Sequence, residues 1–393
     1  MIDDRAAKNI LIVHQSAELY GSDRVLIQLA EGLNAREEFH PIVVLPESGP
    51  LLIELRRIGV EVHVAEVAKL SRAAFSPRGV LGLLGKARRG LRQLDALVAG
   101  RAISVVHSNT IAVLAGALWA RLRRVPHVWH VHEIIRSPSL VRRLFPFLIR
   151  LLSDFVISNS TQTEAWLLGE QPRLKKRSRV VFNGLPSLAE PERGRSEVFR
   201  ETVGADADTL IVTLAGRINR WKGQSVLIEA AGILLRTDLA SRLRYVIVGS
   251  AAPGLEDLPE QLRQRAQELG VGNVVVFRPF IEDVWPVWFG SDIAVVPSIE
   301  PEPFGMVAIE AMAAGLPVVA AGHGGLLDII EEGASGLLVT PGSAEDLARA
   351  IARLARDARL RRTLGEAGRE RQKEKFSATS YVEGIENVYR RFC

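Results

Sequence analysis

Residues 297–320 read Pro-Ser-Ile-Glu-Pro-Glu-Pro-Phe-Gly-Met-Val-Ala-Ile-Glu-Ala-Met-Ala-Ala-Gly-Leu-Pro-Val-Val-Ala, and this stretch decides the fold. It follows an apolar strand at 292–296, turns into a helix that ends at Gly315, and enters the next strand at Pro317. The first turn of a helix has unpaired backbone N–H groups and partial positive charge. A phosphate can therefore bind at the helix start, which comprises Phe304, Gly305, Met306 and Val307.

Two glutamates flank this turn. Glu302 precedes it, and Glu310 lies five residues beyond Gly305, which is about 7.5 Å along the helix axis at a rise of ~1.5 Å per residue. At that separation the two carboxylates do not easily share one metal ion or one proton. They suit hydroxyl groups on either side of a diphosphate, as in a nucleotide sugar. Without this context, two Glu residues eight positions apart would be ordinary surface charge.

The Glu-x7-Glu pair, the Pro-Phe-Gly turn and the Glu-Ala-Met-Ala-x-Gly-x-Pro-Val-Val run occur together here. In this combination the chain resembles retaining glycosyltransferases of family 4, also described as glycosyl transferases group 1. The resemblance implies an α/β fold with two facing Rossmann-like domains (the GT-B fold) and a cleft between them. It covers most of the chain, is strongest over 210–350 and is weaker over 1–200.

The composition describes a globular protein of two ordinary domains. The chain has 393 residues, 47% of them hydrophobic and 24% charged, which excludes a disordered protein. Its single cysteine, Cys393, indicates a reducing compartment rather than a disulfide framework. No signal segment or long apolar run is evident. We therefore expect a cytoplasmic protein, with peripheral contact to the inner face of the membrane as an option.

Charge divides the chain unevenly. Residues 1–190 hold 26 Lys and Arg against 17 Asp and Glu, and residues 191–393 hold 24 against 28. Within 69–150 the balance is 15 basic residues against 2 acidic ones, Asp95 and Glu133. This asymmetry indicates an anionic surface or partner for the first half.

Apolar strands alternate with helical segments, which predicts parallel sheets covered on both faces. We expect strands at 9–14, 41–45, 61–64, 105–107, 127–132, 154–159 and 179–182, then at 210–215, 244–248, 274–277, 293–296, 317–320 and 336–339. The polar stretch 186–203 is predicted to be a linker. The expected domains are 1–187, which binds the acceptor, and 205–376, which binds the nucleotide sugar. By resemblance, a last helix over 377–393 crosses back to the first domain.

In the second half, Gly216-Arg217 ends a strand and Trp221-Lys222-Gly223 opens the next helix. Ligands of open α/β sheets lie at such strand ends, where Arg217 and Lys222 could neutralise a diphosphate. The family resemblance supports this role, although an Arg at a strand end is ordinarily a surface residue. Gly249 and Phe280 follow two further strands, where the family holds the nucleoside base.

In the first half, Tyr20-Gly21-Ser22-Asp23-Arg24 stands where many family members have Gly-Gly-x-Glu-Arg. The turn at Gly21 would approach the donor phosphate, or Ser22 would simply cap a helix. His130 and His132 lie on one face of a strand. By resemblance His132 contacts the donor sugar, and the alternative is a histidine that caps a neighbouring loop. No third ligand supports a zinc site.

Three further motifs have weaker signals. Asn183-Gly184 and Gly322-His323-Gly324-Gly325 resemble turns of the family and are either packing or binding positions. Asp206-Ala207-Asp208 matches an Asp-x-Asp metal motif but precedes a strand, so we interpret it as a turn.

The resulting hypothesis is a retaining enzyme that moves a sugar from a nucleotide-diphosphate-sugar to an acceptor hydroxyl, in the synthesis of a cell-surface glycan or glycolipid. Arg217, Lys222, Glu302 and His132 are the expected catalytic residues, with Glu310 on the ribose. The acceptor would be a glycan, a lipid-linked molecule or a small molecule. We expect no metal, no cofactor and no nucleic acid. Two alternatives are a sugar-nucleotide epimerase of similar fold and a non-catalytic nucleotide-sugar- or anion-binding protein.

Residues 136–152 read Arg-Ser-Pro-Ser-Leu-Val-Arg-Arg-Leu-Phe-Pro-Phe-Leu-Ile-Arg-Leu-Leu. On a helical wheel the arginines gather in one wedge beside apolar residues, which is typical of a helix at a membrane surface. Pro146 predicts a break in this helix, and the basic segment 86–101 adds charge. Alternatively, the apolar face packs in the domain core and the arginines are merely solvated.

Overall fold

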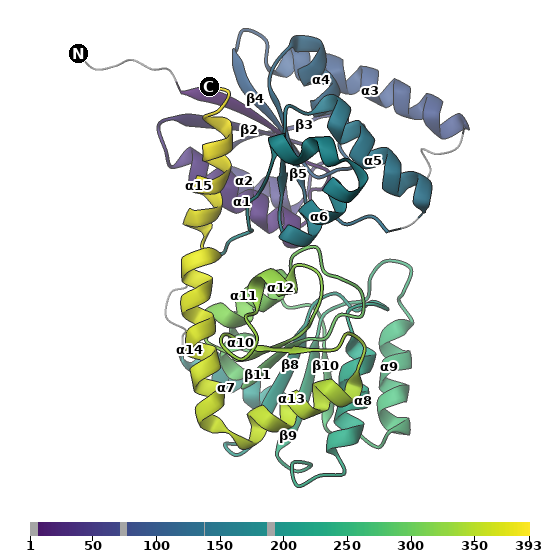
Figure 1. Ribbon diagram of the computed structural model, residues 1–393, viewed down its shortest axis with the longest axis vertical. Coiled ribbons are helices and arrows are strands. Elements are labelled where there is room, and N and C mark those ends of the chain that lie inside the picture. Colours follow the sequence, from purple (N-terminus) through teal and green to yellow (C-terminus); the bar gives the residue numbers. More distant parts are fainter. Residues whose placement is uncertain (1–6, 71–76, 137, 187–192) are drawn as a thin grey trace, which may run out of the picture. The chain divides into compact units, whose positions relative to one another are not determined.

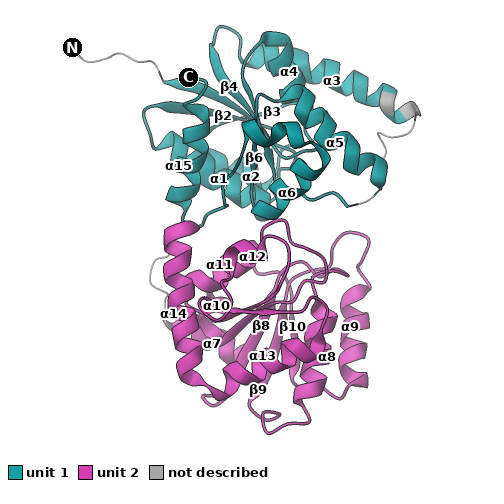
Figure 2. Ribbon diagram, in the orientation of Figure 1, with its two compact units in different colours: residues 1–186, 377–393 teal, residues 187–376 magenta. Residues whose placement is uncertain are grey.

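The computed structural model describes residues 7–70, 77–136, 138–186 and 193–393. The described chain forms two compact units, coloured separately in Figure 2. Unit 1 comprises residues 1–186 and 377–393, and unit 2 comprises residues 187–376. Each unit has its own parallel sheet and its own core.

The described part of unit 1 contains a seven-stranded sheet of order β3-β2-β1-β4-β5-β6-β7, in which every pair is parallel. Its strands are β1 (Lys8–Val13), β2 (Phe39–Leu45), β3 (Glu61–Val64), β4 (Ile103–Asn109), β5 (His127–Val131), β6 (Phe155–Ser158) and β7 (Ser178–Val180). The strands expected in the first half are therefore confirmed, with ends shifted by one or two residues.

Helices cover both faces of this sheet (Figure 1). Alternate residues of β1, such as Leu11 and Val13, pack with apolar residues of the helices that follow β3. The helices of unit 1 are α1 (Gly21–Asn34), α2 (Pro50–Arg57), α3 (Pro77–Leu97), α4 (Ala115–Arg123), α5 (Ser139–Leu152), α6 (Thr161–Glu170), the 3-10 turn η2 (Pro172–Arg177) and α15 (Ala378–Tyr389). The expected last helix is present as α15, which packs on α1.

The described part of unit 2 contains a six-stranded parallel sheet of order β10-β9-β8-β11-β12-β13. Its strands are β8 (Leu210–Ala215), β9 (Leu243–Val248), β10 (Val275–Arg278), β11 (Ile293–Val296), β12 (Val318–Ala321) and β13 (Leu337–Val339). Its helices are α7 (Arg193–Thr202), α8 (Gln224–Leu234), α9 (Leu258–Glu268), α10 (Trp285–Gly290), α11 (Met306–Ala313), α12 (Leu326–Ile329), α13 (Ala344–Arg356) and α14 (Ala358–Lys375). All six strands expected in the second half are confirmed.

Two local predictions are wrong. The expected linker at 186–203 contains α7, because Phe199 is buried against Gly290 of α10 and Arg200 binds Asp292 at 3.0 Å; residues 187–192 lie outside the described residues. Helix α5 also runs through Pro146 without a break, with the proline ring buried in the unit 1 core. Tertiary burial outweighs the local preference in both cases. Among the described helices, none is both long and apolar enough to span a bilayer.

Candidate functional site

The order of the strands locates the candidate site in each unit. All strands of each sheet run parallel, but the order in which the chain adds them reverses between β8 and β11 in unit 2 and between β1 and β4 in unit 1. Ligands of open α/β sheets bind at the carboxyl ends of the strands beside such a reversal. The predicted residues of the second half follow β8, β9, β10 and β11, and those of the first half follow β1 and β5.

The loop after β8 places Arg217 next to the end of β9. Gly216 and Gly249 have φ angles of 143° and 152°, a conformation that favours glycine. A Cβ atom on Gly249 would lie 2.0 Å from the carbonyl oxygen of Gly216, so the two strand ends touch through backbone alone. The Arg217 side chain is exposed there. Phe280, after β10, is 53% exposed, and its N–H donates to the Ser250 hydroxyl at 3.2 Å.

Lys222 and Glu302 form an ion pair across the two loops. Lys222 Nζ lies 2.6 and 2.8 Å from the carboxylate oxygens of Glu302, and the Ser298 hydroxyl donates to the same carboxylate at 2.6 Å. Glu302 is only 4% exposed. Asn219 fixes the approach of the lysine, because its side-chain oxygen accepts from the backbone N–H of Lys222 at 2.9 Å. The sequence predicts both residues for the site but not that they bind each other.

The start of α11 is held by a second glycine turn. A Cβ atom on Gly325 would lie 2.5 Å from Cα of Phe304, and one on Gly324 would lie 2.4 Å from the carbonyl oxygen of Glu302. The motif at 322–325 is thus a packing element under the Glu302 loop. Gly305, with φ of 122°, then turns the chain into α11, so that Met306 and Val307 form its first turn. Helix α11 therefore begins where the sequence predicts, and phosphate binding at its first turn stays a prediction.

Glu310 lies in the second turn of α11. The indole Nε1–H of Trp288 donates to its carboxylate at 3.4 Å, and the side chain is partly buried. The two glutamates of the motif thus lie in different surroundings. Glu302 is buried and paired with the Lys222 ammonium, whereas Glu310 is partly exposed and accepts from the Trp288 indole.

In unit 1 a buried polar chain joins the loops after β1, β4 and β5. Asp23 Oδ1 lies 2.7 Å from His14 Nε2, His14 Nδ1 lies 3.0 Å from the Asn109 carbonyl oxygen, and Asn109 Oδ1 lies 3.0 Å from His132 Nε2. All four residues are at most 8% exposed. Asp23 also accepts from the N–H of Tyr20, next to Gly21, at 2.8 Å. Ser22 lies inside the first turn of α1, whose N-cap is Tyr20, so the alternative role of Ser22 as the helix cap is not found.

Burial and the hydrogen bond to Asn109 together decide the protonation state and the tautomer of His132. Burial lowers the pKa of His132 to about 3, so the ring is neutral near pH 7. Because the amide oxygen of Asn109 accepts a hydrogen bond, His132 Nε2 carries the proton and Nδ1 is left as an acceptor for a hydroxyl group. Desolvation raises the pKa of the adjacent Glu133 to about 7. As predicted from strand alternation, the rings of His130 and His132 lie together, 3.9 Å apart.

No sequence motif points to His14 or Asn109. They are separated by 95 positions and meet only because β1 and β4 are neighbours. The sequence does contain a clue, because each of these polar residues lies at the end of a buried strand, His14 after β1 and Asn109 in β4. The strand order of unit 1 reverses between these two strands. The Asp206 motif is a turn, as expected: its carboxylate accepts from the Thr209 hydroxyl at 2.5 Å and from the Asp208 N–H at 3.1 Å.

Two family models match this chain, one in each unit. Residues 20–187 match the family model described as Glycosyltransferase Family 4, and residues 195–371 match the one described as Glycosyl transferases group 1. The D-inositol 3-phosphate glycosyltransferase of Corynebacterium aurimucosum is 39% identical over 242 residues, which cover 60% of this chain and 56% of that protein. D-inositol 3-phosphate glycosyltransferase 1 of Catenulispora acidiphila is 32% identical, with coverage of 73% and 72%.

A solved structure, HepE of Anabaena in complex with UDP and glucose, superimposes with a TM-score of 0.83 at 26% identity, over 98% of this chain and all of that one. Together, the two units define a protein of the GT-B fold class. Within that class, the chain belongs to glycosyltransferase family 4. It nevertheless spans only about half the length of several curated relatives that it matches.

Proposed function

We propose that the protein transfers a sugar from a nucleoside-diphosphate-sugar to an acceptor hydroxyl. One observation supports this proposal above all. Arg217, the Lys222–Glu302 pair and the first turn of α11 all follow β8 or β11, the two strands between which the strand order of unit 2 reverses. There they present positive charge and N–H groups to a departing diphosphate, and such stabilisation of a leaving group supplies several kcal/mol of catalysis.

The site residues divide into two roles under this proposal. Arg217, Lys222 and the start of α11 bind the diphosphate, Glu310 binds the ribose, and Gly249 and Phe280 border the base. Glu302, held by Lys222 and Ser298, and His132, through Nδ1, bind sugar hydroxyls. No carboxylate is assigned to attack the sugar, which fits a retaining reaction in which the acceptor approaches on the side of the leaving group.

The substrates are proposed from the relatives. HepE has been crystallised with UDP and with UDP-glucose, and the curated relatives are named D-inositol 3-phosphate glycosyltransferases. We therefore propose a UDP-hexose as donor and a hydroxyl of a phosphorylated polyol, or of a cell-surface glycan or glycolipid, as acceptor. The cations at 217 and 222 take the place of a divalent metal ion, so activity should survive EDTA.

A thermal-shift panel of nucleoside diphosphates and their sugars tests the donor site. A ligand at 100 times its Kd stabilises the protein by about 2.7 kcal/mol, and the shift should be lost in Arg217→Ala. Arg220→Ala, an exposed neighbour on the same loop, is the control. Product analysis with the best donor then tests transfer. Conversion of the donor to a new nucleotide sugar without acceptor would instead show an epimerase, and binding without any turnover would show a non-catalytic protein.

A further inference from the structure

Helix α5 has two separate apolar faces. Phe145, Pro146 and Ile149 are buried in the unit 1 core. A second stripe points outward, in which Leu140 is 68%, Phe147 43% and Leu151 55% exposed. With Leu140 at zero, Phe147 and Leu151 fall at about 340° and 20° on the helical wheel, and the buried Phe145 and Ile149 fall at about 140° and 180°. Core packing therefore explains only one of the two faces.

Positive charge borders the exposed stripe. Arg143 and Arg150 fall at about 300° and 280° on the same wheel, directly beside it. The guanidinium of Arg150 lies 5.1 Å from the ring centroid of Phe147. Arg142 lies on the other side and is neutralised by Glu170 at 3.2 Å. The outward face of α5 is thus a row of large apolar side chains with basic residues along one edge.

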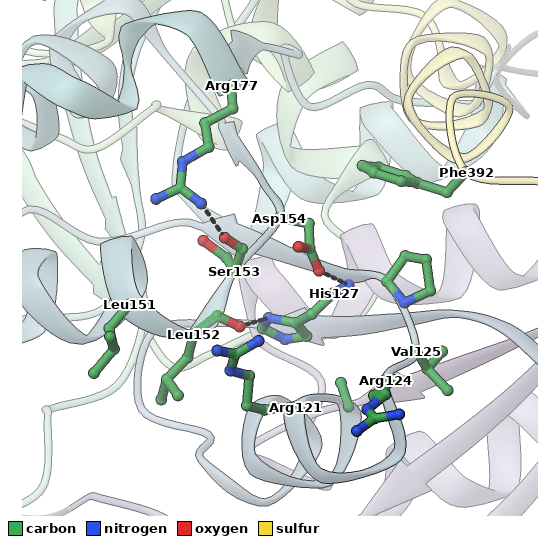
Figure 3. A pocket seen from close by; sticks show the side chains of 12 residues that line it. Arg121, Arg124, Val125, His127, Leu151, Leu152, Ser153, Asp154, Arg177 and Phe392 are labelled. Carbon is green, nitrogen blue, oxygen red and sulfur yellow. Dashed lines mark hydrogen bonds between the residues drawn. The ribbon is translucent and has the colours of Figure 1, made fainter.

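The stripe ends at a basic pocket of about 430 Å³ (Figure 3). Leu151 and Leu152 line it together with three arginines, Arg121, Arg124 and Arg177. Arg177 is engaged by the carbonyl oxygens of Arg150 and Ser153 at the end of α5. Arg121 and Arg124, at the end of α4, are exposed. The acidic group of the pocket, Asp154, accepts from the backbone N–H of His127 at 2.8 Å.

We propose that this face of unit 1 docks on a bilayer that contains anionic phospholipid. The outward stripe of α5 enters the interface between headgroups and acyl chains, and the pocket formed by Arg121 and Arg124 takes a headgroup phosphate. An apolar row alone would equally suit another protein. The membrane is favoured because charge complements it: Arg143 and Arg150 border the stripe, and Arg121 and Arg124 line the pocket at its end.

The orientation of α5 relates the proposed docking to the candidate site of unit 1. The helix follows β5, whose carboxyl end carries His132, and it precedes β6. The stripe therefore begins at the edge of the sheet that holds the candidate site and ends at the opposite edge, about 16 Å further along at ~1.5 Å per residue. A membrane along α5 would bring lipid-borne hydroxyl groups to the edge that carries His132. This consequence rests on the proposed function, whereas the docking itself does not.

Co-sedimentation of the full chain with vesicles tests the proposal without any donor. We expect binding to vesicles of phosphatidylcholine mixed with phosphatidylglycerol in equal parts, little binding to phosphatidylcholine alone, and weakening as salt rises. The double variant Arg121→Glu/Arg143→Glu should bind at least roughly 30-fold more weakly. Phe147→Ser/Leu151→Ser should also weaken binding at least about tenfold, because the lost contact is apolar.

Two matched variants control for charge and hydropathy. Arg359→Glu/Arg362→Glu makes the same change in charge on exposed positions of α14, and Ile53→Ser removes an exposed aliphatic side chain of α2 in the same unit. Both should bind like the unaltered protein. Equal affinity for the α5 variants and these controls, or no binding to anionic vesicles, would overturn the proposal. If the unaltered protein binds anionic vesicles but transfers no sugar, the docking proposal stands and the proposed function does not.

Discussion

At the scale of single residues, the Lys222–Glu302 pair has unequal partners. The side chain of Glu302 is 6% exposed and that of Lys222 is 18% exposed. Removing Lys222 and leaving the Glu302 charge unpaired would therefore destabilise the fold more than the reverse change. Removing one member of a buried ion pair leaves an uncompensated charge, whereas an exposed pair contributes little. The pair therefore serves the fold of the loop as well as the binding of a ligand.

We predict that Lys222→Ala lowers the free energy of unfolding by about 3 kcal/mol and weakens binding of a nucleoside diphosphate. Glu302→Gln should bind the same diphosphate at least as tightly, because it removes the negative charge beside Lys222, yet it should lose turnover. Urea unfolding and calorimetric titration measure these effects. Lys373→Ala, from the exposed Lys373–Glu370 pair, is the control and should change neither. Equal effects of the Lys222 and Glu302 changes on diphosphate affinity would contradict this account.

Gly325 offers a steric test of the same loop. Its φ is −65°, so alanine meets no backbone strain there, but the new Cβ would lie 2.5 Å from Cα of Phe304 and 2.7 Å from the Pro303 carbonyl oxygen. We predict that Gly325→Ala displaces the Glu302–Phe304 loop and weakens donor binding at least about tenfold, or ~1.4 kcal/mol. Gly169→Ala, where nothing lies within 4 Å of the new atom, should leave donor affinity unchanged. Normal affinity in Gly325→Ala would show that the loop does not depend on this contact.

At the scale of elements, the strands were predictable and α7 was not. Runs such as Ile-Val-Thr-Leu-Ala at 211–215 are largely apolar and buried throughout, as strands covered on both faces should be. Helix α7 has the sequence Arg-Gly-Arg-Ser-Glu-Val-Phe-Arg-Glu-Thr and buries mainly Phe199. Two adjacent apolar residues in ten, Val198 and Phe199, give no helical period to detect. Its helix is stabilised by Gly290 and Asp292, which are distant in the sequence.

The role of α7 can be measured at Phe199. Its ring is 7% exposed and fills the space above Gly290, so Phe199→Ala should lower the free energy of unfolding by about 3 kcal/mol through loss of buried area and a residual cavity. The adjacent Val198 is 57% exposed, and Val198→Ala should have an effect close to zero. Similar small effects at both positions in urea unfolding would mean that 193–202 behaves as the linker that the sequence suggested.

At the scale of the whole molecule, the sequence predicted the candidate residues of unit 2 more fully than the buried polar chain of unit 1. Arg217, Lys222, Glu302 and Glu310 belong to local motifs whose spacing has a direct physical meaning. The chain Asp23–His14–Asn109–His132 consists of single polar residues that only the sheet order brings together. Pairings over such separations depend on which strands are neighbours, and periodicity does not contain that information.

Four buried histidines of the unit 1 sheet should make unit 1 sensitive to acid. Burial lowers the pKa of His107, His127 and His132 to about 3 and that of His130 well below its ordinary value of 6.5. Each therefore stabilises the fold fully above pH 6.5 and loses that contribution as the pH falls from 6.5 toward 3, where only the unfolded chain takes up the proton. Glu133 acts in the opposite direction between pH 4.5 and about 7, because its carboxyl group is more readily protonated in the folded state.

Four histidines outweigh one glutamate, so we predict that the free energy of unfolding falls by roughly 3 kcal/mol between pH 7.5 and 5.5. Urea unfolding across this range measures it. His130→Leu should flatten the slope by about one proton, or ~1.4 kcal/mol per pH unit, because no described residue is bonded to either nitrogen of that ring. His63→Leu is the control, since that ring is partly exposed beside Glu61. Burial between sheet and helices opposes protonation of these four rings in the folded chain. A flat pH profile would mean that the rings take up protons there all the same. So would a profile that His130→Leu and His63→Leu alter equally.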